Sequence, residues 1–403
     1  MLENNLFDKI LDHDNIVSAY FELLKKVDEE SKSSTLQGVD GVSINNINYS
    51  SKEIIKIVEE EIKNLKPTNP PFKILIPKKT GKYRSIYIFS IKDRIRAEAI
   101  YRVVSPFFDE YLSDFLYSYR KSHPAYYASR SVIRRYKRFY GSNHILVADL
   151  SDYTDSIDHE LLISSLDKIC LDQKTKNLIE IFIKSSYFEN GKLIKINKGL
   201  MTGTPISGLL SNLFMDDFDK IAGKYVDFYR RVGDDMIAFD KDKNKILSLQ
   251  KTLSKMIKEK KLILNKNKLK VISDKEPFVF LGYRFKNNKI GVNENSLIKI
   301  ISSLKKTLYR YPGSNKLRKK KHFSLNFESN YNSIFIQFKQ IIEQKKLIDD
   351  DNQILNFSEK FYRIITKYFF DKYSEKNRRE TEKLFRYNKI DSLYNHYNKK
   401  FKK

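Results

Sequence analysis

The adjacent aspartates Asp234 and Asp235 constrain this chain more than any other feature of its sequence. They stand in the run Arg230-Arg-Val-Gly-Asp-Asp-Met-Ile-Ala-Phe239, which predicts a strand, a tight turn and a second strand. Two neighbouring carboxylates repel each other, so a fold that keeps both at one turn needs something to offset their charge. Divalent cations do this well, and Mg²⁺ suits carboxylate oxygens. Asp is also a common turn former, so the pair alone fits an ordinary acidic turn too.

A third aspartate, Asp149, ends the apolar run Ile145-Leu-Val-Ala148, which predicts a central strand of a sheet. Asp152 and Asp155 follow it closely. An aspartate that closes a buried strand predicts the second half of a two-metal site. Two such ions activate an attacking hydroxyl and stabilise a leaving pyrophosphate in phosphoryl transfer. The alternative is a pair of unrelated acidic turns.

The charge of the chain points to a polyanionic partner. The 403 residues include 76 lysines and arginines against 50 acidic residues, a formal net charge of +26. Such an excess favours nucleic acid or an anionic membrane surface. AT-rich codon usage is the alternative source of the lysines, although it enriches Glu as well. The hydrophobic fraction of 41% and the aromatic fraction of 13% exclude a wholly disordered chain.

Cysteine content and hydropathy exclude further classes of protein. The single cysteine, Cys170, excludes a disulfide framework and a Cys-rich zinc site. The N-terminus lacks a basic segment followed by an apolar run, so no secretory signal is predicted. No stretch approaches 18 consecutive apolar residues. We therefore expect a cytoplasmic protein with no membrane partner.

Strand and helix patterns alternate up to about residue 292, after which the strand signals stop. The predicted elements are a basic hairpin over residues 72–88, helices over 92–140, a hairpin over 187–198, a helix over 246–260 and a hairpin over 271–290. The remaining tail is predicted to be helical. Residues 301–403 carry 25 lysines and arginines against 11 acidic residues, a net charge of +14.

The order of these segments resembles that of a bacterial reverse transcriptase of the group II intron and retron type. Ala148-Asp-Leu-Ser-Asp-Tyr-Thr-Asp-Ser-Ile-Asp-His159 resembles the first catalytic motif, and Val232-Gly-Asp-Asp235 stands at the aromatic-x-Asp-Asp box. The resemblance covers about residues 70–290. Its seven motifs follow the family order over residues 76–85, 91–95, 148–159, 199–213, 232–235, 262–268 and 280–285.

The resemblance implies an α+β right-hand polymerase with fingers, an antiparallel-sheet palm and a helical thumb. The implied segments are an N-terminal helical extension (1–70), fingers (71–145), a palm with fingers insertions (146–290), and a thumb with a basic helical C-terminal region (291–403). It also implies that Asp149, Asp234 and Asp235 bind two Mg²⁺ ions, or Mn²⁺, with help from the Leu150 carbonyl. Lys268 matches a lysine that protonates the leaving pyrophosphate, although it also fits a solvated lysine in a Lys-rich segment.

Further residues are implied to contact nucleotide and nucleic acid. The expected nucleotide-binding residues are Lys78, Arg84, Leu150, Thr154, Thr202 and Gly203. The expected nucleic-acid contacts are Lys73, Arg130, Arg134, Arg318, Lys319, Lys320 and Lys321. For the lysines of the tail, a solvated helix face is the alternative.

Three positions depart from the family pattern. Thr154, with Tyr153 beside it, stands where the family has a large aromatic near the sugar. Thr202 replaces the family's glutamine, and Val232 replaces the aromatic before the Asp pair. These changes alter the implied contacts to nucleotide and template, while the metal-binding carboxylates remain. They therefore put ordinary templated synthesis in question and leave nucleotidyl transfer in place.

The sequence thus predicts an RNA-directed DNA polymerase that adds dNTPs to a 3′-hydroxyl. No nuclease or integrase pattern follows the palm, so the chain looks most like the defence-associated and abortive-infection enzymes. We expect an antiphage role with a non-coding RNA template or a DNA product strand, and with a second polymerase subunit or a homo-oligomer. One alternative is template-independent or protein-primed polymerisation. The other is an inactive RNA-binding scaffold.

Overall fold

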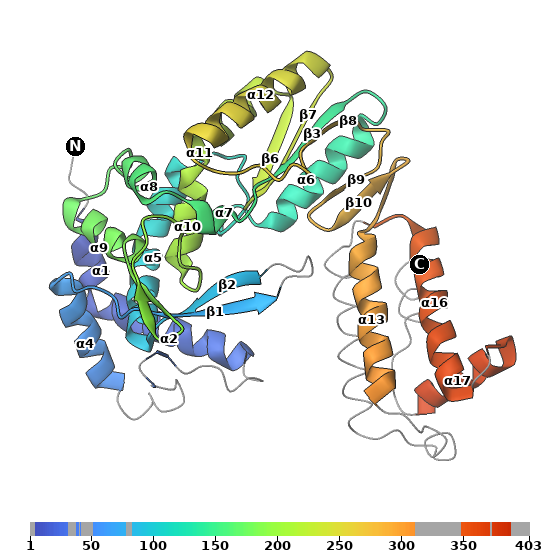
Figure 1. Cartoon of the computed structure of the whole chain (residues 1–403), viewed down its shortest axis with the longest axis horizontal. Helices are drawn as coiled ribbons and strands as arrows, with labels where there is room; N and C mark the ends of the chain where they lie inside the picture. The colour runs from blue at the N-terminus through green and yellow to red at the C-terminus, as the bar shows by residue number, and fades with distance from the viewer. Residues whose placement is uncertain are drawn as a thin grey trace. The chain divides into compact units, whose positions relative to one another are not determined.

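The computed structural model describes residues 5–30, 38–39, 41, 51–77, 83–310, 348–370 and 373–387. The chain groups into two compact units, one of residues 1–132 and 143–272 and the other of residues 133–142 and 273–403. Helices and mainly antiparallel sheets make up the described part, which confirms the predicted α+β class (Figure 1). None of its helices combines the length and apolar character needed to cross a membrane. The four segment boundaries predicted from the sequence stay predictions.

Four helices form the N-terminal part of the first unit. They are α1 (Leu6–Leu11), α2 (His13–Glu30), α4 (Ser51–Lys63) and α5 (Ile91–Tyr111), and the first three pack against α5. The Ser90 side chain caps α5 by accepting from the Asp93 amide. Arg96 is fully buried in α5, where it pairs with Asp93 at 3.1 Å and with Glu61 of α4 at 3.4 Å. A buried arginine is tolerated because its charge is paired in this way.

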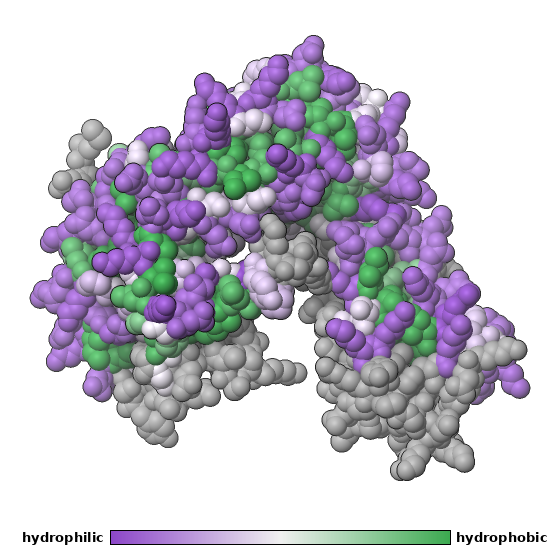
Figure 2. Space-filling model, viewed as in Figure 1, coloured by the Kyte–Doolittle hydropathy of each residue, from purple (hydrophilic) through white to green (hydrophobic). Residues whose placement is uncertain are grey.

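A small sheet with the strand order β2-β1-β4-β5 lies beside these helices. Its strands are β1 (Phe72–Pro77), β2 (Tyr83–Ile88), β4 (Tyr187–Glu189) and β5 (Lys192–Ile194), so both predicted hairpins form. Asn190 and Gly191 have φ values of 50° and 76°, which suits a tight two-residue hairpin turn. Apolar side chains of β1, including Phe72, Leu75 and Ile76, are about half exposed. Figure 2 shows hydrophobic surface in this region.

A central sheet with the order β6-β7-β3-β8 carries the three aspartates. Its strands are β6 (Phe228–Val232), β7 (Asp235–Asp240), β3 (His144–Asp149) and β8 (Lys270–Ser273). β7 pairs antiparallel with both β3 and β6. The helices between residues 125 and 259 are α6 (Ala125–Arg138), α7 (Tyr153–Ser156), α8 (His159–Leu166), α9 (Gln173–Ile183), α10 (Pro205–Phe214), α11 (Asp216–Tyr225) and α12 (Lys243–Glu259). Of these, α11 packs on β6, and α12 packs on β3 and β7.

The second unit contains a three-stranded antiparallel sheet and helices. Its elements are β9 (Phe278–Phe280), β10 (Tyr283–Lys286), β11 (Lys289–Val292), α13 (Glu294–Arg310), α16 (Asp351–Phe370) and α17 (Glu375–Tyr387). The buried ring of Tyr136 packs edge-on against Phe278 and Phe285. The prediction of one hairpin over residues 271–290 is wrong at its start. Val271 lies in β8, which belongs to the central sheet, and a polar turn ending at Pro277 separates β8 from β9.

A second fully buried ion pair of the first unit joins β6 to α11. Arg231 and Asp219 are both fully buried, with Nη2 of Arg231 2.6 Å from Oδ2 of Asp219 and Nε 2.8 Å from Oδ1. The Tyr229 hydroxyl also donates to Asp219 at 2.8 Å. Two further guanidinium protons go to the main-chain carbonyls of Asn212 and Gly233, both at 2.9 Å. The pair thus ties two helices to the central sheet.

We predict that Arg231→Met lowers the free energy of unfolding by about 3–5 kcal/mol, because it leaves the Asp219 carboxylate buried without its cation. Adding Asp219→Leu to this variant should recover part of the loss. Urea unfolding measures both. Lys255→Met is the matched control, since Lys255 pairs with Glu259 at 3.9 Å in an exposed position. Equal effects of Arg231→Met and Lys255→Met would contradict the prediction.

Candidate active site

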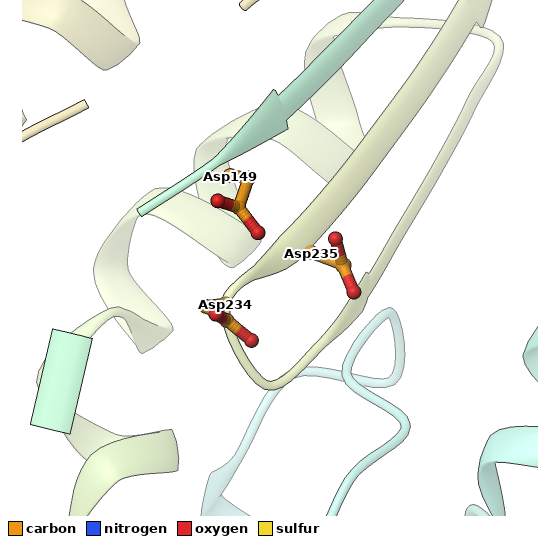
Figure 3. Close-up of side chains that lie close together, drawn as sticks. All are labelled: Asp149, Asp234 and Asp235. Carbon is orange, nitrogen blue, oxygen red and sulfur yellow. The ribbon is translucent and has the colours of Figure 1, made fainter. Parts of the chain in front are cut away.

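Asp149, Asp234 and Asp235 converge at one end of the central sheet. Asp149 ends β3 and lies opposite Asp235, the first residue of β7. Val232 of β6 pairs with Asp235, so Gly233 and Asp234 form a two-residue hairpin loop in which Gly233 has a φ of +63°. One carboxylate oxygen from each aspartate lies within 4.8 Å of the other two. Figure 3 shows the three side chains lying close together. The structure therefore brings together the carboxylates that the sequence singled out.

Buried polar groups fix the hairpin loop through hydrogen bonds to Gly233. Arg231 donates to the Gly233 carbonyl, and the Gly233 amide donates to the Ser118 hydroxyl at 2.9 Å. That hydroxyl in turn donates to the Asn212 side chain at 2.8 Å. Since each of these partners is buried, the position of Asp234 is fixed by the interior of the fold. The roles of Ser118, Asn212 and Arg231 were not predicted from the sequence.

Two side chains that follow α12 contact Asp149 directly. Lys268 places its Nζ 2.6 Å from Oδ1 of Asp149 and 3.9 Å from Oδ1 of Asp235. Asn265 donates its side-chain amide to Oδ2 of Asp149 at 3.0 Å, and its main-chain amide donates to the Asp149 carbonyl at 2.9 Å. Lys268 was predicted and is found at the carboxylates. Asn265 was missed, although it stands in the same motif, three residues before Lys268.

The cluster carries more negative charge than its own residues offset. Burial, together with the charge of Asp234, raises the pKa of Asp235 to about 7. Burial and the charge of Asp149 also raise the pKa of Asp234. For Lys268, the hydrogen bond to Asp149 and the three carboxylates outweigh burial, so its pKa is raised. Three carboxylates against one ammonium leave excess negative charge, and hard oxygen donors fit a divalent cation such as Mg²⁺.

A cavity of about 420 Å³ adjoins the carboxylates. Its lining includes four residues predicted to bind nucleotide, together with one of the three aspartates: Arg84, Thr154, Thr202, Gly203 and Asp234. Arg84 is exposed and its charge acts on Asp234. Leu150, also predicted here, is buried and bridges to Leu264. A second cavity, of about 460 Å³ between Pro67 and Leu193, is lined by none of the three aspartates.

The segment 199–204 packs closely against β2. The Thr202 hydroxyl donates to the Ser85 carbonyl at 3.1 Å, and the Tyr87 amide donates to the Thr202 carbonyl at 3.1 Å. Gly203 has a φ of +128°, and a Cβ there would lie 2.4 Å from the Tyr87 carbonyl oxygen. Only glycine fits this approach. Thr202 and Gly203 thus fix one wall of the cavity to the strand that carries Arg84.

Tyr153, which stands beside the non-aromatic Thr154, is part of the core. Its ring is 5% exposed and its hydroxyl donates to the Ser211 carbonyl. Burial raises its pKa well above the usual value. Tyr153 therefore presents no free aromatic face at the position where Thr154 lies.

The predicted nucleic-acid contacts lie in varied surroundings. Lys73 pairs with Glu189 at 3.0 Å and lies 5.1 Å from the centre of the Tyr187 ring. Arg130 and Arg134 are exposed on α6, one helical turn apart. The predicted residues Lys78, Arg318, Lys319, Lys320 and Lys321 lie outside the described residues.

The sequence of this chain is similar to those of known proteins. The sequence profile of the family described as reverse transcriptase (RNA-dependent DNA polymerase) matches residues 76–285. Protein YkfC of Escherichia coli is 26% identical over 194 residues, which are 47% of this chain and 51% of YkfC. Group II intron-encoded protein LtrA of Lactococcus lactis is 26% identical over 173 residues, 43% of this chain and 28% of LtrA. The chain thus spans about half or less of these relatives.

Among solved structures, telomerase from Candida albicans in complex with a fragment of telomeric RNA aligns with a TM-score of 0.46 and 12% identity. The alignment covers 84% of this chain and 65% of that one.

We predict that the affinity for Mg²⁺ rises as the pH increases from 6 to 8. The folded protein holds a proton on Asp235 below about pH 7, and a metal ligand must be deprotonated. The proton therefore competes with the metal at low pH, whereas above pH 7 Asp235 is mostly deprotonated and the competition disappears. Calorimetric titration in buffers of different ionisation enthalpy should show proton release that falls toward zero by pH 8. Affinity that stays constant over this range would contradict the prediction.

We also predict that Gly203→Ala lowers both stability and nucleotide binding, because the new Cβ would press on the Tyr87 carbonyl. Gly191→Ala is the matched control. Gly191 also has a positive φ, of +76°, but nothing lies within 4 Å of a Cβ there. Thermal unfolding and nucleotide titration compare the two variants. If both variants lose the same amount of stability and of nucleotide affinity, backbone strain rather than the close approach to Tyr87 explains the effect.

Proposed function

Since the chain belongs to the reverse transcriptase (RNA-dependent DNA polymerase) family, we propose that it is an RNA-directed DNA polymerase that adds deoxynucleotides to a 3′-hydroxyl. The observation that carries the proposal is the convergence of Asp149, Asp234 and Asp235 beside a cavity lined by Arg84. An acidic cluster that holds metal ions next to a basic residue suits a triphosphate, because the metal ions and the basic side chain together neutralise the charge of the phosphates.

In the proposed reaction the 3′-hydroxyl gives up its proton to solvent, its oxygen attacks the α-phosphorus of the incoming nucleotide, and the bond to pyrophosphate breaks. Asp149, Asp234 and Asp235, with the Leu150 carbonyl, would hold two Mg²⁺ or Mn²⁺ ions. Such ions lower the pKa of the hydroxyl and stabilise the leaving group. Arg84 would bind the triphosphate. Lys268, whose Nζ lies at Asp149, would deliver a proton to the pyrophosphate.

The proposed partner is an RNA template with its growing DNA strand. The exposed arginines of α6, Arg130 and Arg134, offer phosphate contacts one helical turn apart. We further propose that the template is a non-coding RNA and that the biological role is antiphage defence. This finer part rests on the resemblance of the motifs. A second subunit is part of the same proposal.

A second candidate function, template-independent or protein-primed polymerisation, has its own support. The side chain at position 202 bonds to the main chain of β2, and Thr154 offers no aromatic face. Both features reduce contacts that would discriminate among nucleotides or read a template. The inactive-scaffold alternative lacks such support, because it gives the three carboxylates and the neighbouring Lys268 no task.

We predict that Asp234→Asn or Asp235→Asn lowers nucleotide incorporation by more than about 100-fold, because each removes a carboxylate that offsets metal charge. Purified protein is given an RNA of defined sequence, an annealed primer, dNTPs and Mg²⁺. Asp167→Asn, which changes an exposed aspartate of a different ion pair, is the matched control.

The sequence of the product decides between the candidates. A copy complementary to the RNA supports the RNA-directed polymerase. A product independent of the added RNA supports the second candidate. If wild-type protein and both variants give no incorporation yet retain RNA binding, the scaffold alternative holds. Phage plating on cells that express wild-type or Asp234→Asn protein tests the role in defence.

A further inference from the structure

The cavity beside the carboxylates has one exposed aromatic wall. Two of its lining residues are aromatic, Tyr119 and Tyr153. Tyr153 is in the core, whereas Tyr119 is 61% exposed. The lining otherwise carries Arg84, hydroxyl side chains and carboxylates, which suit a triphosphate and its metals. A nucleotide also has a flat, largely apolar nucleoside part, and Tyr119 offers a surface that matches it.

The backbone at Tyr119 is held in an unfavourable conformation. Its φ is +52°, in the left-handed region that bulky residues rarely occupy. The residues on either side, Ser118 and Arg120, are buried at 8% and 7% exposure, so the exposed ring is anchored on both sides. Arg120 donates to the carbonyls of Ser113 and Asp109, each at 2.7 Å. Strained residues held by their surroundings often mark functional positions.

The segment that carries Tyr119 is fixed to the hairpin that carries Asp234. The Tyr117 amide donates to the Arg231 carbonyl at 2.8 Å, and the Arg231 amide donates to the Phe115 carbonyl at 3.0 Å. The Gly233 amide donates to the Ser118 hydroxyl. These three bonds set the distance between the aromatic ring and the metal site, which a substrate-binding residue requires.

Helix α10 leaves room for the ring at Gly208. A Cβ at this position would lie 2.6 Å from Cγ of Tyr119, closer than van der Waals contact allows. The ring therefore rests on the helix backbone, with its other side toward solvent. A larger residue at position 208 would displace it.

We propose that Tyr119 is a nucleotide-binding residue of the polymerase site, whose ring packs against the nucleoside part of the incoming dNTP. The inference rests on the proposed function and adds a contact that none of the sequence motifs contains. It also assigns the aromatic contact to a segment distant in sequence from Thr154. Base–aromatic contacts tolerate any base, because every base has a π face.

The test measures KM and kcat for each dNTP with Tyr119→Ala, Tyr119→Phe and Gly208→Ala. We expect KM to rise about tenfold or more for all four dNTPs in Tyr119→Ala, as alanine substitution of a stacking aromatic predicts. Tyr119→Phe should stay close to wild type. Gly208→Ala should raise KM as well, since it moves the ring without removing it. Tyr127→Ala, at a 53% exposed tyrosine of α6 outside the cavity, is the matched control.

A second measurement separates a binding role from a structural one. Tyr119→Gly relieves the left-handed backbone, so its melting temperature should equal or exceed that of the wild type while its KM rises. A fall in melting temperature that accompanies the rise in KM would assign Tyr119 a structural role and overturn the proposal. An unchanged dNTP KM with weaker binding of the template would also overturn it.

Wild-type protein is assayed first on the same template. If it incorporates no nucleotide, the proposed function fails, and nucleotide titration of Tyr119→Ala against wild type still tests the binding role of the ring. If it incorporates nucleotide and Tyr119→Ala has an unchanged KM, only the inference about Tyr119 fails.

Discussion

The pairing of Arg231 with Asp219 is the constraint on which the rest of the site depends. A fully buried guanidinium needs both a counter-charge and acceptors for its remaining protons. Arg231 meets this need with the Asp219 carboxylate and with the carbonyls of Asn212 and Gly233. Two helices, a strand and the loop that presents Asp234 are therefore fixed by one side chain. The loop that presents Asp234 is thus bonded to a basic group that has no contact with solvent.

Charge balance explains how three carboxylates share one end of a sheet in the folded chain. Lys268 lies against Asp149, and a proton on Asp235 below about pH 7 removes a further negative charge. Lys268 and this proton therefore offset part of the negative charge of the carboxylates in the folded chain, and bound cations would offset the rest. Because the lysine is exposed and long, it is able to move aside without disturbing β3.

The sequence predicted that the three aspartates lie together, because Asp149 ends an apolar strand, Asp235 begins another and Asp234 stands next to it in the turn, so strand pairing sets their distance. It also predicted the hairpins at residues 72–88 and 187–198. It did not predict the partners that support the site. Arg231 and Asp219 are twelve residues apart and meet only through the fold, although Arg231 alternates with Tyr229 on the inward face of β6. Tyr119 lies in an irregular segment with no periodic pattern, so only the structure brings it to the cavity.

The irregular segment before Tyr119 has a consequence for the solubility of the molecule. β6 is an outer strand of the central sheet, and unpaired outer strands are templates for association with other chains. Residues 115–117 lie alongside it, with a parallel bridge between Leu116 and Arg231 and main-chain bonds on both sides. The same stretch of backbone that leads to the cavity thus closes one edge of the sheet against aggregation.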